Sequence, residues 1–261
     1  MIKLVFALVG LLLSLQCTTS PTGRTQLHVL SDDQLNGMGA QSFEEMKKKV
    51  PASKDQTINK NVTCVVNLLL QRNGWNPSEW EVQVFQDDQV NAFALPGNKI
   101  GVYTGMFKTA KNQGQLAAVI GHEIGHVIAR HGNERVSQQL LVQGGLAIAQ
   151  LKTDPNSQTG RAVLTALGLG ANFGILLPYS RKHESEADEL GVDYMAKAGF
   201  DPREAKQLWI NMASIGAKGA PEILSTHPDS GRRANDIEAR LPEALKIQQA
   251  ALAQHPAPNC Y

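Results

Sequence analysis

The segment His122-Glu123-Ile124-Gly125-His126 limits what this chain can fold into more than any other feature of its sequence. Residues four apart on a helix lie on one face, so the two imidazoles can bind the same cation. Glu123 would then lie beside that cation, where its carboxylate can take a proton from an attacking water. The pattern H-E-x-x-H is typical of zinc peptidases, although two ordinary helix histidines are the alternative.

The residues around this motif predict the helix that it needs, from Asn112 to Arg130. Asn112 can cap the helix, and apolar residues recur after it at roughly helical spacing. Burial of those apolar residues would hold a metal site rigidly. Gly121 and Gly125 lower the helix propensity, but their small size would let another backbone or a bound peptide approach closely.

The third metal ligand is not in the same segment. Catalytic zinc takes three protein ligands and leaves one position for water. A metzincin would provide a third histidine at position 132, but this chain has Gly132 there, and His131 is one residue out of register. The ligand must therefore come from elsewhere in the chain.

The best candidates lie on a helix that Ser180 can cap. Glu184 and Asp188 are four residues apart and face one way. Glu184 can bind zinc, while Asp188 accepts the free N–H of a ligating histidine and fixes its tautomer. An acidic first turn that suits the helix dipole is the alternative for both residues. Glu186 faces elsewhere, either solvated or paired with a base.

Five segments of this chain occur together, in the order 91–97, 122–126, 177–181, 184–188 and 227–228, with Arg233 behind the last. In this combination the chain resembles the M48 zinc metallopeptidases. That family includes Ste24-like, HtpX-like and Oma1-like proteins, together with secreted or lipoprotein members of the bacterial envelope. The resemblance runs from about residue 91 to about residue 233, which is over half of the chain.

The resemblance implies an α+β, mostly helical, zincin-like domain with a small β-sheet and the H-E-x-x-H helix. It also implies a zinc endopeptidase with one Zn2+ per chain and a polypeptide substrate. The implied zinc ligands are His122, His126 and Glu184, with Asp188 behind them and Glu123 as the base. His227 would stabilise the developing oxyanion, with Arg233 supporting or sharing that role. Without the resemblance, a loop histidine and a surface arginine would be preferred.

Residues 80–104 predict the small sheet, with strands at about 80–84, 90–95 and 99–104. Pro96-Gly97-Asn98 would join the last two strands. An exposed strand edge can hold an extended substrate by backbone hydrogen bonds, and Pro96 suits a strand end. The residues predicted to bind substrate in this way are Asn91, Ala92, Phe93 and Ala94. A core strand with Phe93 buried is the other interpretation.

The N-terminus predicts export from the cytoplasm. Lys3 precedes an apolar run over residues 4–15, which is shorter than the roughly 20 residues of a membrane span and is typical of a secretory signal. Cys17 follows this run and predicts a bacterial lipoprotein in which Cys17 is lipidated. Thr18 is not the acidic residue that favours retention in the inner membrane, so the lipid anchor is expected in the outer membrane.

The lipoprotein pattern is imperfect, because Ser14 and Gln16 stand where leucine and a small residue are usual. The alternative is cleavage near Thr19 or Ser20, which would give a soluble secreted or periplasmic protein. The predicted boundaries are residues 1–17 for the signal, 18–30 for a tether rich in Thr, Ser, Pro and Gly, and 31–261 for a single M48-like metallopeptidase domain.

The two remaining cysteines can form a disulfide, and the net charge bears on nucleic-acid binding. Cys64 and Cys260 could pair in an oxidising periplasm and pin the C-terminal tail to an early helix. The alternative is a buried free Cys64 and a frayed Cys260. The net charge of +1 gives no indication of nucleic-acid binding. The oligomeric state is not indicated.

Periodicity predicts further helices outside the motifs. The expected ranges are 31–49 with a capping box, 58–72, a core pair at 140–151 and 162–178 with a polar loop at 153–160, about 201–215, and one that starts at Asp229 or Ser230. Pro242 is expected to begin an Ala- and Gln-rich tail.

The predicted function is zinc-dependent cleavage of unfolded or misassembled proteins in the bacterial envelope. A non-catalytic chaperone or scaffold with a structural zinc is one rival, but the sequence offers no obvious fourth ligand for a closed site. A different zinc hydrolase, such as an amidase, is the second rival.

Overall fold

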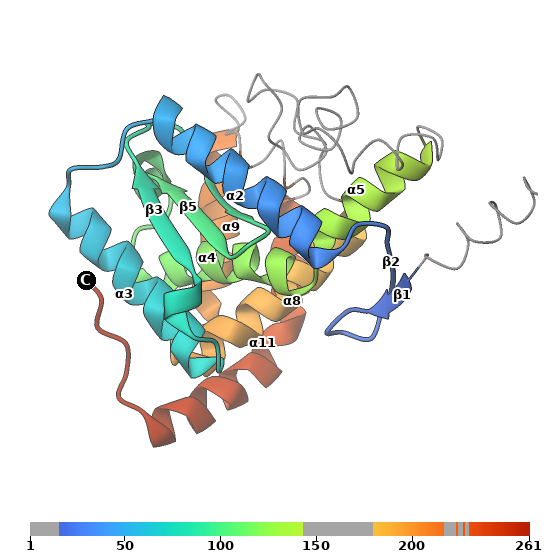
Figure 1. Cartoon of the computed structure of the whole chain (residues 1–261). Helices are drawn as coiled ribbons and strands as arrows, with labels where there is room; N and C mark the ends of the chain where they lie inside the picture. The colour runs from blue at the N-terminus through green and yellow to red at the C-terminus, as the bar shows by residue number, and fades with distance from the viewer. Residues whose placement is uncertain (1–15, 143–179, 217–222, 224–226, 228–229) are drawn as a thin grey trace, which may run out of the picture.

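The computed structural model describes residues 16–142, 180–216, 223, 227 and 230–261 (Figure 1). It confirms the predicted class, α+β and mostly helical. The helices are α2 (Asp32–Lys49), α3 (Gln56–Arg72), α4 (Gln113–Ile128), α5 (His131–Val142), α8 (Arg181–Lys197), α9 (Arg203–Gly216) and α11 (Ser230–Gln254). The strands are β1 (Gln16–Thr19), β2 (Thr25–His28), β3 (Glu81–Phe85), β4 (Ala92–Leu95) and β5 (Lys99–Tyr103). Within this part of the chain, no helix is both long and apolar enough to cross a membrane.

Local capping signals place the starts of the helices. Ser31 forms the predicted capping box with Gln34, and the side chains of Asn112 and Ser180 accept backbone N–H groups at the starts of α4 and α8. Helix α3 begins two residues before the predicted Ile58, because the Asp55 carboxylate accepts the N–H groups of Thr57 and Ile58. Side-chain acceptors at the first turn therefore decide these boundaries.

The three-stranded sheet has the order β3-β5-β4, so β4 is an edge strand. Strand β3 runs parallel to β5, and β4 runs antiparallel to it. The turn between β4 and β5 needs left-handed backbone at Gly97 and Asn98, where φ is 80° and 59°. The predicted three strands and their connecting turn are thus confirmed.

Helices cover both faces of this sheet (Figure 1). On one face, Ile100 and Val102 join the main core with residues of α3 and α4. On the other face, Phe85 and Tyr103 pack with Phe43 of α2. Strand β4 alternates in the same way, because its alanines belong to the main core while Phe93 packs toward α2.

Helices α4 and α8 approach each other at backbone distance. A Cβ atom built on Gly191 would lie 2.7 Å from the backbone nitrogen of His122, and one on Gly125 would lie 3.0 Å from the carbonyl oxygen of Ala187. The expectation that Gly121 and Gly125 admit another backbone is confirmed, and that backbone belongs to α8. This contact brings the H-E-x-x-H residues beside the acidic residues of α8.

Residues 18–30 do not form the predicted tether. Strands β1 and β2 pair as an antiparallel hairpin, with Cys17 opposite Leu27. Other polar residues of this segment find buried partners: Arg24 binds Glu134, and Gln26 donates to the carbonyl oxygen of Ala129. The hairpin is therefore attached to the domain near the start of α5.

Pro242 does not begin a tail. Helix α11 continues through Pro242 to Gln254, because Ala244 and Ala251 remain buried on its inner face and Ile247 packs against the core. A proline removes one helical hydrogen bond, and here the packing of the following turns outweighs that loss.

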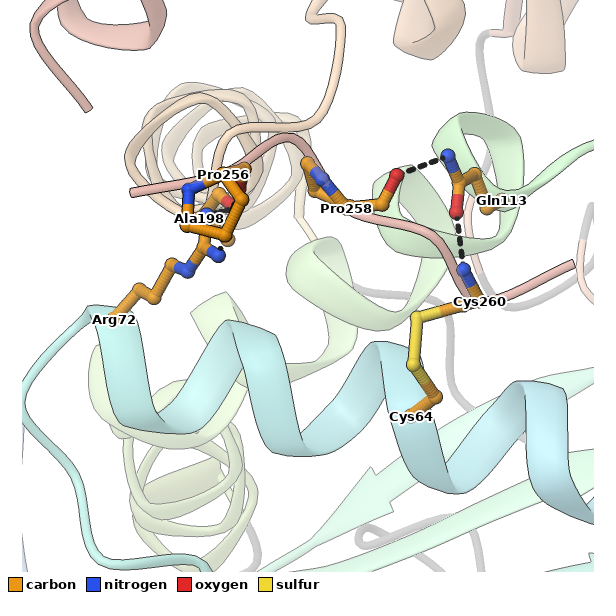
Figure 2. Close-up of a disulfide and its surroundings, with 7 residues drawn as sticks. All are labelled: Cys64, Arg72, Gln113, Ala198, Pro256, Pro258 and Cys260. Atoms are coloured by element: carbon orange, nitrogen blue, oxygen red, sulfur yellow. Dashed lines mark hydrogen bonds between the residues drawn. A yellow bond between two sulfur atoms is a disulfide. The ribbon is translucent and has the colours of Figure 1, made fainter. Parts of the chain in front are cut away.

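The segment after α11 runs back along α3 and is fixed there by the predicted disulfide (Figure 2). Cys64 and Cys260 are joined, with their Cα atoms 5.6 Å apart. Gln113 donates to the carbonyl oxygen of Pro258 and accepts from the backbone N–H of Cys260. The predicted core pair at 140–151 and 162–178, its loop at 153–160, the apolar run at 4–15, Tyr179 and Pro228 lie wholly or mainly outside the described residues.

Candidate metal centre

Helix α4 brings the two motif histidines together in the core. The Nε2 atoms of His122 and His126 lie 3.0 Å apart, and each residue is only 2% exposed. The predicted helix is confirmed, and this face of it is buried in the core. The two imidazoles therefore present one ring nitrogen each to a common point.

Helix α8 brings the two predicted carboxylates to opposite sides of these rings. Glu184 places its carboxylate oxygens 3.6 Å from His122 Nε2 and 3.5 Å from His126 Nε2. Asp188 instead places Oδ1 3.0 Å from His122 Nδ1. Glu184 thus lies at the Nε2 side of both histidines and Asp188 at the Nδ1 side of His122, which is the placement that their predicted roles require.

His227 lies in the same cluster, although it is far away in the sequence. Its Nδ1 is 3.0 Å from Glu184 Oε1 and 3.2 Å from His122 Nε2, and its Nε2 is 3.5 Å from Glu123 Oε1. His122, His126, Glu184 and His227 each offer a ligand atom within 4.8 Å of all the others. The sequence offered no obvious fourth ligand, because His227 was assigned only the role of an oxyanion donor.

The spacing of these atoms fits a zinc ion. Two ligand atoms at about 2.1 Å from a tetrahedral zinc would lie about 3.4 Å apart. The distances among the ligand atoms of His122, His126 and Glu184 run from 3.0 to 3.6 Å. Two imidazoles and one carboxylate also form a known catalytic ligand set for zinc.

Arg233 is fully buried beneath the cluster. Its guanidinium binds Asp188 through two hydrogen bonds of 2.7 and 2.6 Å, and its Nη1 lies 2.7 Å from Glu184 Oε2. It also stacks 3.4 Å over the ring of Trp209 in α9. The guanidinium is therefore engaged with both carboxylates, which favours the supporting role over direct donation to a substrate.

The surroundings set the protonation states that a metal site needs. Burial, with the charge of Arg233, lowers the pKa of His122 to about 4, and burial lowers the pKa of His126 well below its ordinary value. Burial would raise the pKa of Glu184, but the charges of His227 and Arg233 outweigh it and lower that pKa to about 2. Neutral imidazoles and an ionised carboxylate are the forms that bind zinc.

Glu123 has the properties of a base. Burial raises the pKa of its carboxyl to about 7, close to the pH at which a base must exchange a proton. Its Oε2 accepts the backbone N–H of Ala94 at 3.3 Å. The base and the edge strand β4 therefore face each other.

The register of β4 shows which of its backbone groups face outward. Asn91 accepts from the N–H of Tyr103, so alternate residues beginning with Asn91 bond to β5. Ala92 and Ala94 therefore direct their backbone groups toward the open edge, whereas Asn91 and Phe93 direct theirs inward. Both alanines are buried.

A cavity of about 330 Å3 lies beside the end of this edge. Its walls come from Leu35 of α2, the end of β4 from Ala94 onward, the last turn of α4 at His126, Val127 and Ile128, and Arg130 after that helix. It is thus adjacent to both the metal ligands and the edge strand.

A model of the peptidase family M48 matches residues 56–241 of the chain. Among curated proteins, the mitochondrial metalloendopeptidase OMA1 of Schizosaccharomyces pombe is 40% identical over 196 residues, which are 74% of this chain and 56% of that protein. The metalloendopeptidase OMA1 of Danio rerio is 35% identical over 87% of this chain and 50% of its own length. The beta-barrel assembly-enhancing protease of Yersinia pestis is 29% identical over 81% of this chain and 44% of its own length. The chain thus spans about half the length of these relatives.

Proposed function

Because the chain belongs to peptidase family M48, we propose that it is a zinc-dependent endopeptidase and that its own residues work as follows. His122, His126 and Glu184 hold the zinc, and Asp188 fixes the orientation of His122. The observation that carries this proposal is the convergence of three buried ligand atoms beside the buried carboxyl of Glu123.

A zinc ion in this site would act as a Lewis acid toward a peptide carbonyl and would acidify water. Glu123 takes the proton of the attacking water and then gives it to the leaving amine. His227 donates a hydrogen bond to the oxyanion that develops, and Arg233 stabilises the ionised form of Glu184. These roles need the buried, preorganised geometry that α4 and α8 provide.

The substrate is an extended polypeptide that pairs with β4. Ala92 and Ala94 direct backbone groups to the outer edge of β4, and a substrate strand would replace Glu123 as the acceptor of the Ala94 N–H. Such pairing does not depend on the side chains of the substrate. The cavity beside Leu95 and His126 would receive one substrate side chain. Backbone recognition favours unfolded or misassembled proteins, because their chains can become extended.

Substitution of Glu123 by glutamine tests the mechanism. Digestion of casein and of an unfolded outer-membrane protein would be compared for the zinc-loaded wild type and Glu123→Gln, with and without a chelator. We expect the variant to keep its zinc and to lose cleavage. A variant that cleaves as well as the wild type would refute the assigned mechanism.

We place the protein in the bacterial envelope, held by a lipid on Cys17. The Cys64–Cys260 disulfide favours an oxidising compartment. Cys17 is the second residue of β1, so a lipid on Cys17 would anchor the hairpin directly. One relative is named for β-barrel assembly, whereas others are named as mitochondrial. Cells fed labelled palmitate should incorporate the label into the wild-type protein of the membrane fraction and not into Cys17→Ser. Equal labelling of the two proteins would refute the anchor. A wild type found in the soluble fraction would support cleavage without lipidation.

A non-catalytic scaffold is the second candidate, and His227 is the observation that favours it. A closed structural site needs a fourth protein ligand, and His227 lies where it can supply one. A wild type that binds zinc and unfolded protein but cleaves neither casein nor the unfolded outer-membrane protein would support this candidate.

A further inference from the structure

A second buried polar network lies behind His126, outside the cluster that surrounds the metal position. His131 Nδ1 is 2.9 Å from His126 Nδ1, and His131 Nε2 is 3.0 Å from Glu186 Oε2. Glu186 in turn accepts from Thr22 and from Arg24 of the N-terminal hairpin. One chain of contacts therefore joins the hairpin to a candidate zinc ligand.

From these contacts we propose that His131 and Glu186 are positioning residues for His126, and that the hairpin holds them in place. The inference rests on the proposed function, since it assumes that His126 binds zinc. It adds a role for three residues that the mechanism does not use, namely Arg24, His131 and Glu186.

Hydrogen-bonding chemistry fixes the direction of this relay. A carboxylate can only accept, so the His131 nitrogen that faces Glu186 carries the proton. In a neutral His131 the other nitrogen, Nδ1, is then an acceptor, and it receives the Nδ1–H of His126. The Nε2 lone pair of His126 is thereby directed at the point that Glu184 and His122 share. Such a bond orients a metal-binding histidine and increases its basicity.

The backbone brings His131 to this position. Helix α4 ends at Ile128, and Arg130 adopts a left-handed conformation with φ of 54°. The chain therefore turns before α5 begins at His131, and this residue points back at the ring of His126 five positions earlier. A continuous helix would have carried His131 to another face.

The hairpin supplies the charge that steadies Glu186. Arg24 donates through Nε to Glu186 at 2.9 Å and through its two terminal nitrogens to Glu134 at 2.8 and 2.7 Å. Glu134 also meets His183, which stacks on His131. Both glutamates are buried, with Glu186 5% and Glu134 7% exposed, and both bind Arg24. They differ in their histidine partner, because Glu186 bonds to His131 and Glu134 to His183.

This difference gives a matched pair of variants. Glu186→Gln and Glu134→Gln each remove the charge of one buried carboxylate that binds Arg24. If the network were purely structural, both variants would change zinc affinity similarly. A positioning role predicts that only Glu186→Gln weakens the hold on zinc. The zinc dissociation constant of the full chain would be measured by competition with a chromophoric chelator, and the absorption spectrum of the cobalt-substituted protein would report the ligand geometry.

We expect Glu186→Gln to weaken zinc binding by about 10- to 100-fold and to shift the cobalt spectrum. Glu134→Gln should keep a zinc dissociation constant close to that of the wild type, because the histidine that Glu134 bonds to is His183. If Glu186→Gln does not fold, His131→Phe keeps the stacking on His183 without offering an acceptor and should show the same loss. Equal zinc affinity in all variants, or an equal loss in both glutamine variants, would overturn the positioning role. A folded wild type without zinc would instead refute the proposed function itself.

Discussion

Buried charges of opposite sign hold the candidate ligands at the scale of single residues. The guanidinium of Arg233 meets the carboxylates of Asp188 and Glu184. Protonation of either carboxylate would leave the buried arginine without its full counter-charge, so both are kept ionised. Arg233 thus stabilises the anionic form of Glu184.

His227 can be tested by its effect on turnover. Loss of a donor to the developing oxyanion should lower kcat by about 10²- to 10³-fold in His227→Ala, with KM nearly unchanged. Steady-state cleavage of a fluorogenic peptide and zinc content would be measured together. Higher activity with the zinc retained would contradict the donor role and would show that His227 occupies the position that water needs.

At the scale of elements, the close packing of α4 on α8 sets the geometry of the site. The small residues Gly121, Gly125 and Gly191 let the two backbones meet, so ligands from both helices reach one point. Side chains larger than hydrogen would separate the helices and move Glu184 away from the histidines.

Substitution of Gly191 by alanine tests that contact. The new Cβ would lie 2.7 Å from the His122 nitrogen, so Gly191→Ala should lower the free energy of unfolding by about 1–3 kcal/mol and weaken zinc binding. Gly37→Ala in α2 is the control, because no atom lies within 4 Å of its Cβ, and it should be neutral or stabilising by up to about 1 kcal/mol. Chemical unfolding of both variants checks this; equal effects would argue against the helix contact.

The elements were predictable where the determining interaction is local. Ser31, Asn112 and Ser180 cap the helices that their sequence positions predicted. Helical spacing placed Glu184 and Asp188 on one face, and the family resemblance then identified them as the third ligand and its partner. The hairpin at residues 16–28 was not predicted, since its polar residues are ordered by partners more than 100 positions away, such as Glu134 and Glu186.

Within the site, the same limit applies to His131 and His227. His131 was considered only as a metzincin ligand out of register, because the left-handed Arg130 that turns it toward His126 has no clear signal in the sequence. His227 was identified by family resemblance, but its distance of 3.0 Å from Glu184 depends on how α8 packs against α11, which local patterns do not specify.

At the scale of the whole molecule, the disulfide joins residues 196 positions apart and attaches the C-terminal segment to α3 (Figure 2). Arg72 reinforces this attachment by donating to the carbonyl oxygens of Ala198 and Pro256. None of the residues joined by these contacts is a candidate metal ligand.

Removal of the disulfide should therefore affect stability more than metal binding. The double variant Cys64→Ser with Cys260→Ser should lose about 3–5 kcal/mol of unfolding free energy, because its unfolded chain is no longer constrained by a long loop. Its zinc content should match that of the wild type. Denaturant titration checks the first expectation; loss of zinc from the folded variant would show that the C-terminal segment also supports the site.

The most direct test of the metal centre is the zinc content of the purified full chain, measured for the wild type, Glu184→Ala and Glu189→Ala. Glu189 lies on the same helix but is exposed, so it controls for loss of an acidic residue from α8. We predict about one zinc per chain in the wild type and in Glu189→Ala, and loss of zinc in folded Glu184→Ala. A folded, freshly purified wild type without zinc would contradict the metallopeptidase assignment, and zinc retained by Glu184→Ala would contradict the assigned third ligand.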